Sequence, residues 1–183
     1  LPKVQGWIFL GPDEALPDSD STLPNLCSYE RLLAAETGDY DWPRLDERHA
    51  STICYTSGTT GAPKGVVYSH RSTVLCALTM SLADMIGGYW SGAREVVMPI
   101  APLFHANGWQ MPYTAPLNGH KLVLPGRNFE PERLYELMAA ERVTVAAAVP
   151  TIWLGLVDYM DRARVRLGSL RAALVAGTKA PQK

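Results

Sequence analysis

The sequence has almost no net charge, so it lacks the broad basic field that attracts nucleic acids. Its 183 residues include 17 Lys and Arg and 18 Asp and Glu, which gives a formal charge of −1 at pH 7. Proteins that bind nucleic acid usually carry a clustered excess of Lys and Arg. We therefore expect no nucleic-acid partner, and we assign the arginines of residues 161–171 to a solvated helix end.

Cysteine is also scarce. The chain contains only Cys27, Cys54 and Cys76, which are odd in number, lie far apart and match no metal-ligand spacing. Each lies beside apolar or small residues. We predict that all three are reduced thiols in the core.

Long hydrophobic runs are missing as well. The longest one, residues 143–157, is interrupted by Pro150 and is short for a bilayer, which needs about 20 apolar residues. No basic and apolar leader opens the sequence. From these absences we expect a cytoplasmic protein.

What the sequence does contain is typical of a folded domain. Apolar residues make up 47% of the chain and charged residues 19%, as in ordinary globular proteins. Strands are predicted at residues 7–11, 52–56, 65–69, 95–100, 121–125, 143–149 and 171–177. Their alternation with helices predicts a layered α/β fold with a largely parallel sheet whose two faces are both covered.

The predicted helices begin at residues that favour a helix N-terminus. Ser28 and Ser69 precede the first two helices as caps, and Pro131 and Pro150 open the next two. Residues 37–48 form a polar connector. The predicted apolar faces of the last three helices contain Val74, Leu75, Leu78, Leu82 and Ile86; Leu134, Leu137 and Met138; and Ile152, Trp153, Leu156, Tyr159 and Met160.

The stretch YTSGTTGAPKG, residues 55–65, has the composition of an anion-binding loop. Backbone N–H groups can converge on an anion in a glycine-rich loop because no Cβ obstructs the approach, and hydroxyl groups add donors. Lys64 adds a charge suited to phosphate oxygens. A Walker-type P-loop is disfavoured, since Pro63 precedes Lys64 and Gly65 replaces the magnesium-binding hydroxyl. A mobile surface loop of small residues is the alternative.

The same stretch resembles the phosphate-binding signature of the adenylate-forming superfamily, which includes acyl-CoA synthetases, luciferases and peptide-synthetase adenylation domains. The signature is filled by Thr56, Ser57, Gly58, Thr59, Thr60, Gly61, Pro63, Lys64 and Gly65. This resemblance implies that residues 56–61 and Lys64 bind ATP, that Lys64 is catalytic, and that Thr56 also helps to hold Mg²⁺. A glutamate further along the parent chain is expected to complete the magnesium site.

A second stretch, PIAPLFHANGWQMPY at residues 99–113, places a histidine where a strand is interrupted by prolines. It resembles the Pro-x-Phe-His-x-Asn-x-Trp motif of fatty-acyl-CoA synthetases, which is filled by Pro102, Phe104, His105, Asn107 and Trp109.

This second resemblance implies that His105 is catalytic and approaches the substrate carboxylate and the α-phosphate, and that the main chain of Ala106 lines the adenylate site. Asn107 and Trp109 are expected on the substrate side, with Trp109 at the mouth of an acyl tunnel. From the residues alone, a hydrogen-bonded structural histidine and a core tryptophan are the alternatives.

A third stretch, LVAGTKAP at residues 174–181, resembles the Gly-rich turn that the family places against the adenine and the acyl group. Gly177 matches the second glycine of that turn, so Gly177 and Thr178 are expected to bind the nucleotide, and Gly177 also the substrate. Ala176 replaces the usual first glycine, and Lys179 brings a long charged side chain to an otherwise apolar wall.

Together, these resemblances imply part of a fatty-acid–CoA ligase. The parent would activate a medium- or long-chain fatty acid with ATP and Mg²⁺, release pyrophosphate and transfer the acyl group to coenzyme A. Residues 1–183 would be part of its N-terminal AMP-binding domain, without the mobile C-terminal domain, and are expected to be inactive alone.

Several alternatives stay open at this point. They are an aryl- or other acid–CoA ligase, an acyl-AMP ligase that serves a carrier protein, and a non-catalytic nucleotide- or acyl-binding scaffold. The acyl chain length, a peripheral membrane contact and a homodimer are left open too.

Overall fold

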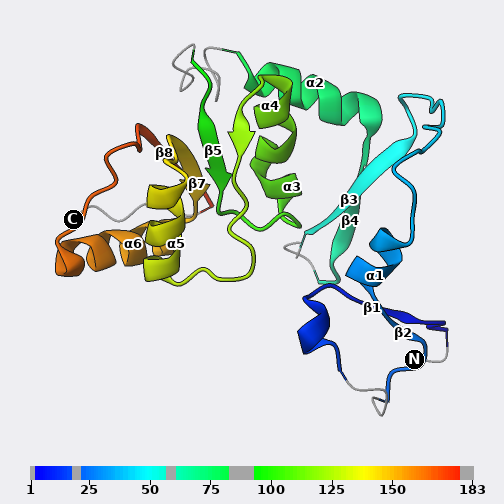
Figure 1. Ribbon diagram of the computed structural model, residues 1–183. Coiled ribbons are helices and arrows are strands. Elements are labelled where there is room, and N and C mark those ends of the chain that lie inside the picture. The colour runs from blue at the N-terminus through cyan, green and yellow to red at the C-terminus, as the bar shows by residue number, and fades with distance from the viewer. Residues whose placement is uncertain (1–2, 18–21, 57–60, 83–92, 178–183) are drawn as a thin grey trace. The chain divides into compact units, whose positions relative to one another are not determined.

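The computed structural model describes residues 3–17, 22–56, 61–82 and 93–177 (Figure 1). The chain divides into two compact units, Leu1–Leu45 and Asp46–Lys183, and each is described by itself. All three sequence motifs belong to the second unit.

The first unit is a short parallel strand pair with two helical turns. Its elements are β1 (Trp7–Phe9), a 3-10 helix (Asp13–Ala15), β2 (Leu26–Ser28) and α1 (Tyr29–Ala34). The predicted cap at Ser28 is confirmed, because its hydroxyl accepts a hydrogen bond from the Arg31 N–H at 3.3 Å. The same hydroxyl donates to Asp13 Oδ1 at 2.5 Å, which ties the 3-10 helix to the start of α1.

The second unit contains an antiparallel hairpin and a parallel sheet. Its elements are β3 (Ala50–Thr56), β4 (Lys64–Ser69), α2 (His70–Met80), β5 (Val96–Pro99), α3 (Ala106–Trp109), α4 (Met111–Leu117), β6 (Lys121–Leu122), α5 (Pro131–Ala140), β7 (Val145–Ala148), α6 (Pro150–Ala163) and β8 (Ala172–Val175). Strands β3 and β4 form the hairpin, and the sheet has the order β6-β5-β7-β8 with every pairing parallel. The predicted α/β class is confirmed. Across the described residues, no helix is both long and apolar enough to cross a membrane.

Helices cover both faces of the inner strands, as predicted. Successive residues of β5 and β7 point to opposite faces. One face packs on α5 and α6 through Met98, Ala146, Leu134, Met138 and Leu156, and the other packs on α4 through Val97, Val145, Ala147, Met111 and Ala115. In Figure 1, α3 and α4 lie between this sheet and the hairpin. This arrangement places the second motif between the sheet and the first motif.

A buried carboxylate lies at the amino-terminal end of the sheet, just before β5. Glu95 is only 2% exposed; it accepts a hydrogen bond from Thr144 Oγ1 at 2.6 Å and forms an ion pair with Arg171. The assignment of Arg171 to a solvated helix end is therefore wrong, because a buried carboxylate requires a compensating charge. The neighbouring His120 has a lowered pKa because burial disfavours its charged form, although Glu95 opposes the shift.

The predicted apolar face of α2 is also wrong. Val74, Leu75 and Leu78 are exposed, and the buried residues of this helix are Thr73 and Ala77. These small side chains allow α2 to approach β3 and α4 closely, as the 3.1 Å contact between the Ser51 and Thr73 hydroxyls illustrates. Leu82 lies beyond the end of α2, and Ile86 lies outside the described residues.

The prediction of three core thiols is confirmed only for Cys54. Cys54 is buried, Cys76 is half-buried and Cys27 is exposed, and none of the three forms a disulfide. Cys27 is exposed because it belongs to the small two-stranded sheet of the first unit, which has little core of its own.

Candidate active site

The hairpin brings two predicted phosphate-site residues opposite each other. Thr56 and Lys64 form the last antiparallel pair before the connecting loop, and directly opposite residues have Cβ atoms about 4.5–5.5 Å apart. Both side chains are exposed. Ser57, Gly58, Thr59 and Thr60 lie outside the described residues. Gly61, on the return side of the loop, has a φ of +122°. Because Thr56 and Lys64 are paired, a hydroxyl and an ammonium group flank the entrance to the predicted anion loop.

The second motif forms a left-handed turn after the carboxyl end of the inner strand β5. His105 precedes α3, and the next residues Asn107, Gly108, Trp109 and Gln110 have φ values of +51°, +63°, +54° and +62°. Each non-glycine residue in this region costs about 1–2 kcal/mol. Such strain persists only where the surrounding contacts enforce it, and it is common at functional sites.

His105 lies at the outside of this turn. Its side chain is exposed, its N–H donates to the Pro102 carbonyl at 3.0 Å, and its own carbonyl accepts from the Gly108 N–H at 3.0 Å. These two bonds fix the backbone on both sides of Ala106, so the imidazole can reach a ligand without disturbing the fold.

Asn107 forms hydrogen bonds to strand β3, and its expected place on the substrate side stays a prediction. Its side chain is buried; Nδ2 donates to Thr52 Oγ1 at 2.9 Å, and Oδ1 accepts from Cys54 Sγ at 3.0 Å. Both partners lie on β3, the strand that ends at Thr56. Asn107 therefore joins the second motif to the first.

Trp109 packs partly buried against the core cluster on the α4 side of the sheet. This contact is what the core alternative predicts, and the place of Trp109 at the mouth of an acyl tunnel stays a proposal. Next to it, Gln110 is 8% exposed, and its Oε1 is buried without a hydrogen-bond partner among the described residues. Because an unpaired buried oxygen costs free energy, a donor group bound at this turn would be stabilised there.

Gly177 follows β8 and lies at the same edge of the sheet as the His105 turn, since the carboxyl ends of parallel strands share one edge. Its φ is +99°, and a Cβ at this position would lie 3.2 Å from Val149 Cγ1. Trp153 Nε1 donates to the Leu174 carbonyl at 3.1 Å and holds β8 against α6. Thr178 and Lys179 lie outside the described residues.

The residues present fit a magnesium ion only in part. Among the described residues, no group of three or more His, Cys, Asp or Glu side chains gathers in a metal-binding arrangement. Mg²⁺ is typically held by one or two protein carboxylates together with substrate phosphates and water. The Thr56 hydroxyl at the loop entrance would add one more oxygen to such a site.

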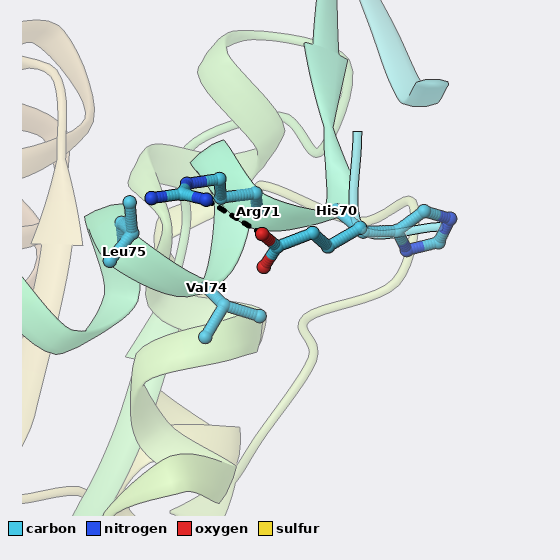
Figure 2. A pocket seen from close by; sticks show the side chains of 5 residues that line it. His70, Arg71, Val74 and Leu75 are labelled. Carbon is cyan, nitrogen blue, oxygen red and sulfur yellow. Dashed lines mark hydrogen bonds and ion pairs between the residues drawn. The ribbon is translucent and has the colours of Figure 1, made fainter. Parts of the chain in front are cut away.

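A pocket at the start of α2 lies apart from these residues. It has a volume of about 270 Å³ and is lined by Glu47, His70, Arg71, Val74 and Leu75. Figure 2 shows the His70 ring directed away from Arg71, whose guanidinium contacts Glu47 Oε1 at 2.6 Å. No predicted site residue lines this pocket in the described part of the chain, so we do not assign it to the site.

Two residues of the site, Thr52 and Cys54, were missed by the sequence analysis. The signal is the alternation in STICYT, residues 51–56, which places Thr52, Cys54 and Thr56 on one face of the strand and Ile53 and Tyr55 on the other. These short side chains lie on the same face of β3 as Thr56, and this is the face that Asn107 contacts.

Comparison with known proteins places these features in a family context. The sequence profile of a family described as "AMP-binding enzyme" matches residues 12–183. The chain is 41% identical, over 99% of its length, to a 3-methylmercaptopropionyl-CoA ligase of Ruegeria lacuscaerulensis. It is 44% identical, over 100% of its length, to a long-chain-fatty-acid–CoA ligase of Thermus thermophilus.

The chain spans about one third of these relatives, 33% and 31% of their lengths. Among solved structures, the inhibitor-bound N-terminal domain of FACL13 from Mycobacterium tuberculosis matches 92% of the chain, with 42% of that domain covered, a TM-score of 0.67 and 23% identity. At this identity the structural match supports the fold.

Proposed function

This chain belongs to the AMP-binding enzyme family, and from that premise we propose that it contributes the phosphate- and acyl-binding part of a fatty-acid–CoA ligase. The complete protein would use ATP to convert a medium- or long-chain fatty acid to acyl-AMP and then transfer the acyl group to coenzyme A. The similarity to the Thermus thermophilus long-chain ligase and the match to the fatty-acyl-CoA synthetase motif support this choice.

The first half-reaction joins two anions. A carboxylate oxygen forms a bond to the α-phosphorus of ATP, and the bond from that phosphorus to the bridging oxygen breaks, so pyrophosphate leaves with the electron pair. Negative charge grows on the α-phosphate oxygens, and fixed donors and cations lower the barrier. Lys64 and the N–H and hydroxyl groups of residues 56–61 suit this role, and His105 would contact the carboxylate and the α-phosphate.

The second half-reaction transfers the acyl group. The thiol of coenzyme A loses its proton, its sulphur bonds to the acyl carbon, and the carbon–oxygen bond to AMP breaks. AMP therefore keeps an oxygen that came from the fatty acid. A bound Mg²⁺ would neutralise phosphate charge, and within this chain Thr56 would help to hold it.

The observation that carries this proposal is the contact between the two motifs. Asn107 bonds both Thr52 and Cys54, so the turn that contains His105 is attached to the strand that leads into the loop between Thr56 and Lys64. A phosphate-binding loop and a carboxylate-binding turn must lie close together to join ATP and an acid. The geometry supports adenylation over a scaffold that binds only one ligand.

Other acids are alternative candidates for the substrate, because the Ruegeria relative is named for a short sulphur-containing acid. The panel for the test therefore includes octanoate, palmitate, 3-methylmercaptopropionate and benzoate. A cytoplasmic location stays an expectation from the sequence, and a peripheral membrane contact and a homodimer stay open.

The test uses the full-length protein that contains this chain. Acid-dependent exchange of labelled pyrophosphate into ATP, without coenzyme A, measures adenylation, and the Lys64→Ala variant is the control. Thioester formation with coenzyme A or with an acyl carrier protein then identifies the acceptor. We expect exchange with octanoate or palmitate and transfer to coenzyme A. Binding of nucleotide with no exchange for any acid would support the scaffold instead.

A further inference from the structure

The side chain of Asn107 forms hydrogen bonds to the strand that leads into the first motif. It is 8% exposed, and its amide is engaged on both sides, at 2.9 Å by Thr52 Oγ1 and at 3.0 Å by Cys54 Sγ. We propose that Asn107 is a positioning residue that fixes the phosphate side of the site relative to the acyl side. This inference rests on the proposed adenylation.

The first step of the argument is the face of β3 that Asn107 contacts. Side chains two residues apart in a strand lie on the same face, so Thr52, Cys54 and Thr56 share a face. Lys64 is the cross-strand partner of Thr56 and shares that face as well. By holding Thr52 and Cys54, Asn107 sets the position of the strand end that presents Thr56 and Lys64.

The second step is the backbone at Asn107 itself. Its φ is +51°, and it opens the left-handed turn between His105 and Trp109. Asparagine tolerates this conformation better than most residues. Because its amide is anchored on β3, the turn has an external contact that offsets its strain, and the position of His105 is set together with the hairpin.

The third step is what the chemistry requires. A carboxylate held near His105 and an α-phosphate held near Lys64 react only when the two groups meet in line, and a shift of about 1 Å can reduce the rate about 100-fold. Apart from the contact of His105 with the α-phosphate, each substrate is held from one side of the site. Loss of the Asn107 contact should therefore lower kcat for adenylation and leave the KM values for ATP and fatty acid nearly unchanged.

The experiment uses the full-length protein and three substitutions. Asn107→Gly removes the amide but accepts the positive φ without strain. Asn107→Asp keeps the shape but removes the N–H donor to Thr52, and Thr52→Val removes the acceptor at nearly constant volume. Asn118→Ala is the control for loss of an asparagine amide, because Asn118 Nδ2 also makes two hydrogen bonds of 2.8 Å, to Ser81 Oγ and the Thr114 carbonyl, but its side chain is exposed and lies outside the two motifs.

The readout is acid-dependent pyrophosphate exchange, measured at a temperature where circular dichroism shows every variant folded. We expect Asn107→Gly to lower kcat by about 10- to 100-fold and to change either KM by less than about threefold. Thr52→Val should lower kcat in the same direction, and Asn107→Asp should lower it less, because the Thr52 hydroxyl can donate to the new carboxylate. The double variant of Asn107→Gly with Thr52→Val should be no slower than the slower single variant, because both remove one contact. Asn118→Ala should lower Tm without this loss of kcat.

A second readout does not depend on activity. Cys54 is 5% exposed, so its alkylation, followed by mass spectrometry of the peptide, reports opening of β3 from the turn. Asn107→Gly should speed alkylation of Cys54, and Asn118→Ala should not.

Two kinds of failure can be told apart. Suppose that the wild-type protein catalyses the exchange, and that Asn107→Gly is folded and matches wild type in both kcat and the rate of Cys54 alkylation. This outcome would overturn the inference on Asn107 and leave the proposed function intact. The inference would also be overturned if Asn118→Ala lost as much kcat as Asn107→Gly at a similar Tm, because the loss would then reflect general destabilisation. No exchange by the wild-type protein with any acid would overturn both the inference and the proposed function.

Discussion

Substitution of Gly108 tests whether the left-handed turn is needed for activity. Gly108 has a φ of +63°, and a Cβ built on it lies 2.9 Å from Leu103 Cδ2. An alanine in this conformation costs about 1–2 kcal/mol relative to glycine. Overpacking usually adds about 1–3 kcal/mol, and the low end applies because Leu103 is half exposed and can yield. Gly108→Ala should therefore lower the free energy of unfolding by about 2–3 kcal/mol.

Gly119→Ala is a control for the backbone part of this cost. Gly119 has a similar φ of +70°, but a Cβ there meets nothing within 4 Å. The two substitutions share the strain of the left-handed region and the loss of unfolded-chain entropy, so their difference isolates the contact with Leu103. We expect Gly108→Ala to be less stable than Gly119→Ala by about 1 kcal/mol in urea unfolding of the full-length protein.

Activity separates the two glycines further. Gly108→Ala should move the turn and reduce acid-dependent pyrophosphate exchange, and Leu103→Ala in the same chain should restore part of it. Gly119→Ala should leave exchange unchanged, because Gly119 lies after α4 and outside the motif. Equal stability of the two variants, together with full activity of Gly108→Ala, would refute the account of the turn.

Three further predictions concern Lys64, Trp109 and His120. Lys64→Ala should reduce pyrophosphate exchange about 10²–10³-fold, as loss of one donor to a developing charge usually does, while fatty-acid binding in calorimetry stays the same; equal loss of both would count against the phosphate role. Trp109→Ala should cost about 3 kcal/mol in thermal unfolding, because the ring packs on the core. Fatty-acid binding by this variant without nucleotide would support a ring that closes the acyl tunnel until ATP binds, and an unchanged order of ligand binding would exclude that role. The pKa of His120 is lowered by burial from its ordinary 6.5, against an opposing effect of Glu95. Just below that pH the unfolded chain therefore binds more protons than the folded one, and the free energy of unfolding should fall as pH drops from 7 through this range. Urea unfolding at several pH values should show a weaker fall in His120→Gln, and identical pH dependence of wild type and variant would contradict the lowered pKa of His120.

Much of the second unit could be predicted from sequence because its local signals agree with its packing. Pro131 and Pro150 open α5 and α6, and Leu134, Met138 and Leu156 are buried at helical spacing. The apolar run of β7 is fully buried between two helix layers. In these segments propensity, periodicity and burial favour the same structure.

The prediction for α2 failed because its apolar residues do not face the described part of the core. Thr73 and Ala77 make the close contacts instead. Helical periodicity identifies the apolar face of a helix, but the helix packs through the face that its neighbours approach most closely. In the left-handed turn after His105, Asn107 and Gly108 are residue types that favour this conformation, but Trp109 and Gln110 give no such signal in the sequence.

The candidate site was predictable as a set of motifs but not as an arrangement. The composition of residues 55–65 indicates anion binding, yet the pairing of Thr56 with Lys64 depends on the hairpin register. The role of Asn107 depends on a contact 55 residues away in the chain, with Thr52. Such long-range hydrogen bonds have no local signal.

The measurement that tests the central claim most directly follows the oxygen atoms of the acid. The full-length protein is supplied with ATP, coenzyme A and a fatty acid labelled with ¹⁸O in its carboxylate, and the AMP produced is examined by mass spectrometry. Formation of acyl-AMP predicts that each AMP carries one ¹⁸O, because the carboxylate oxygen bonded to the α-phosphorus stays with AMP when the thioester forms. Thioester formation with unlabelled AMP, or with ADP and labelled phosphate as the products, would contradict adenylation by this protein.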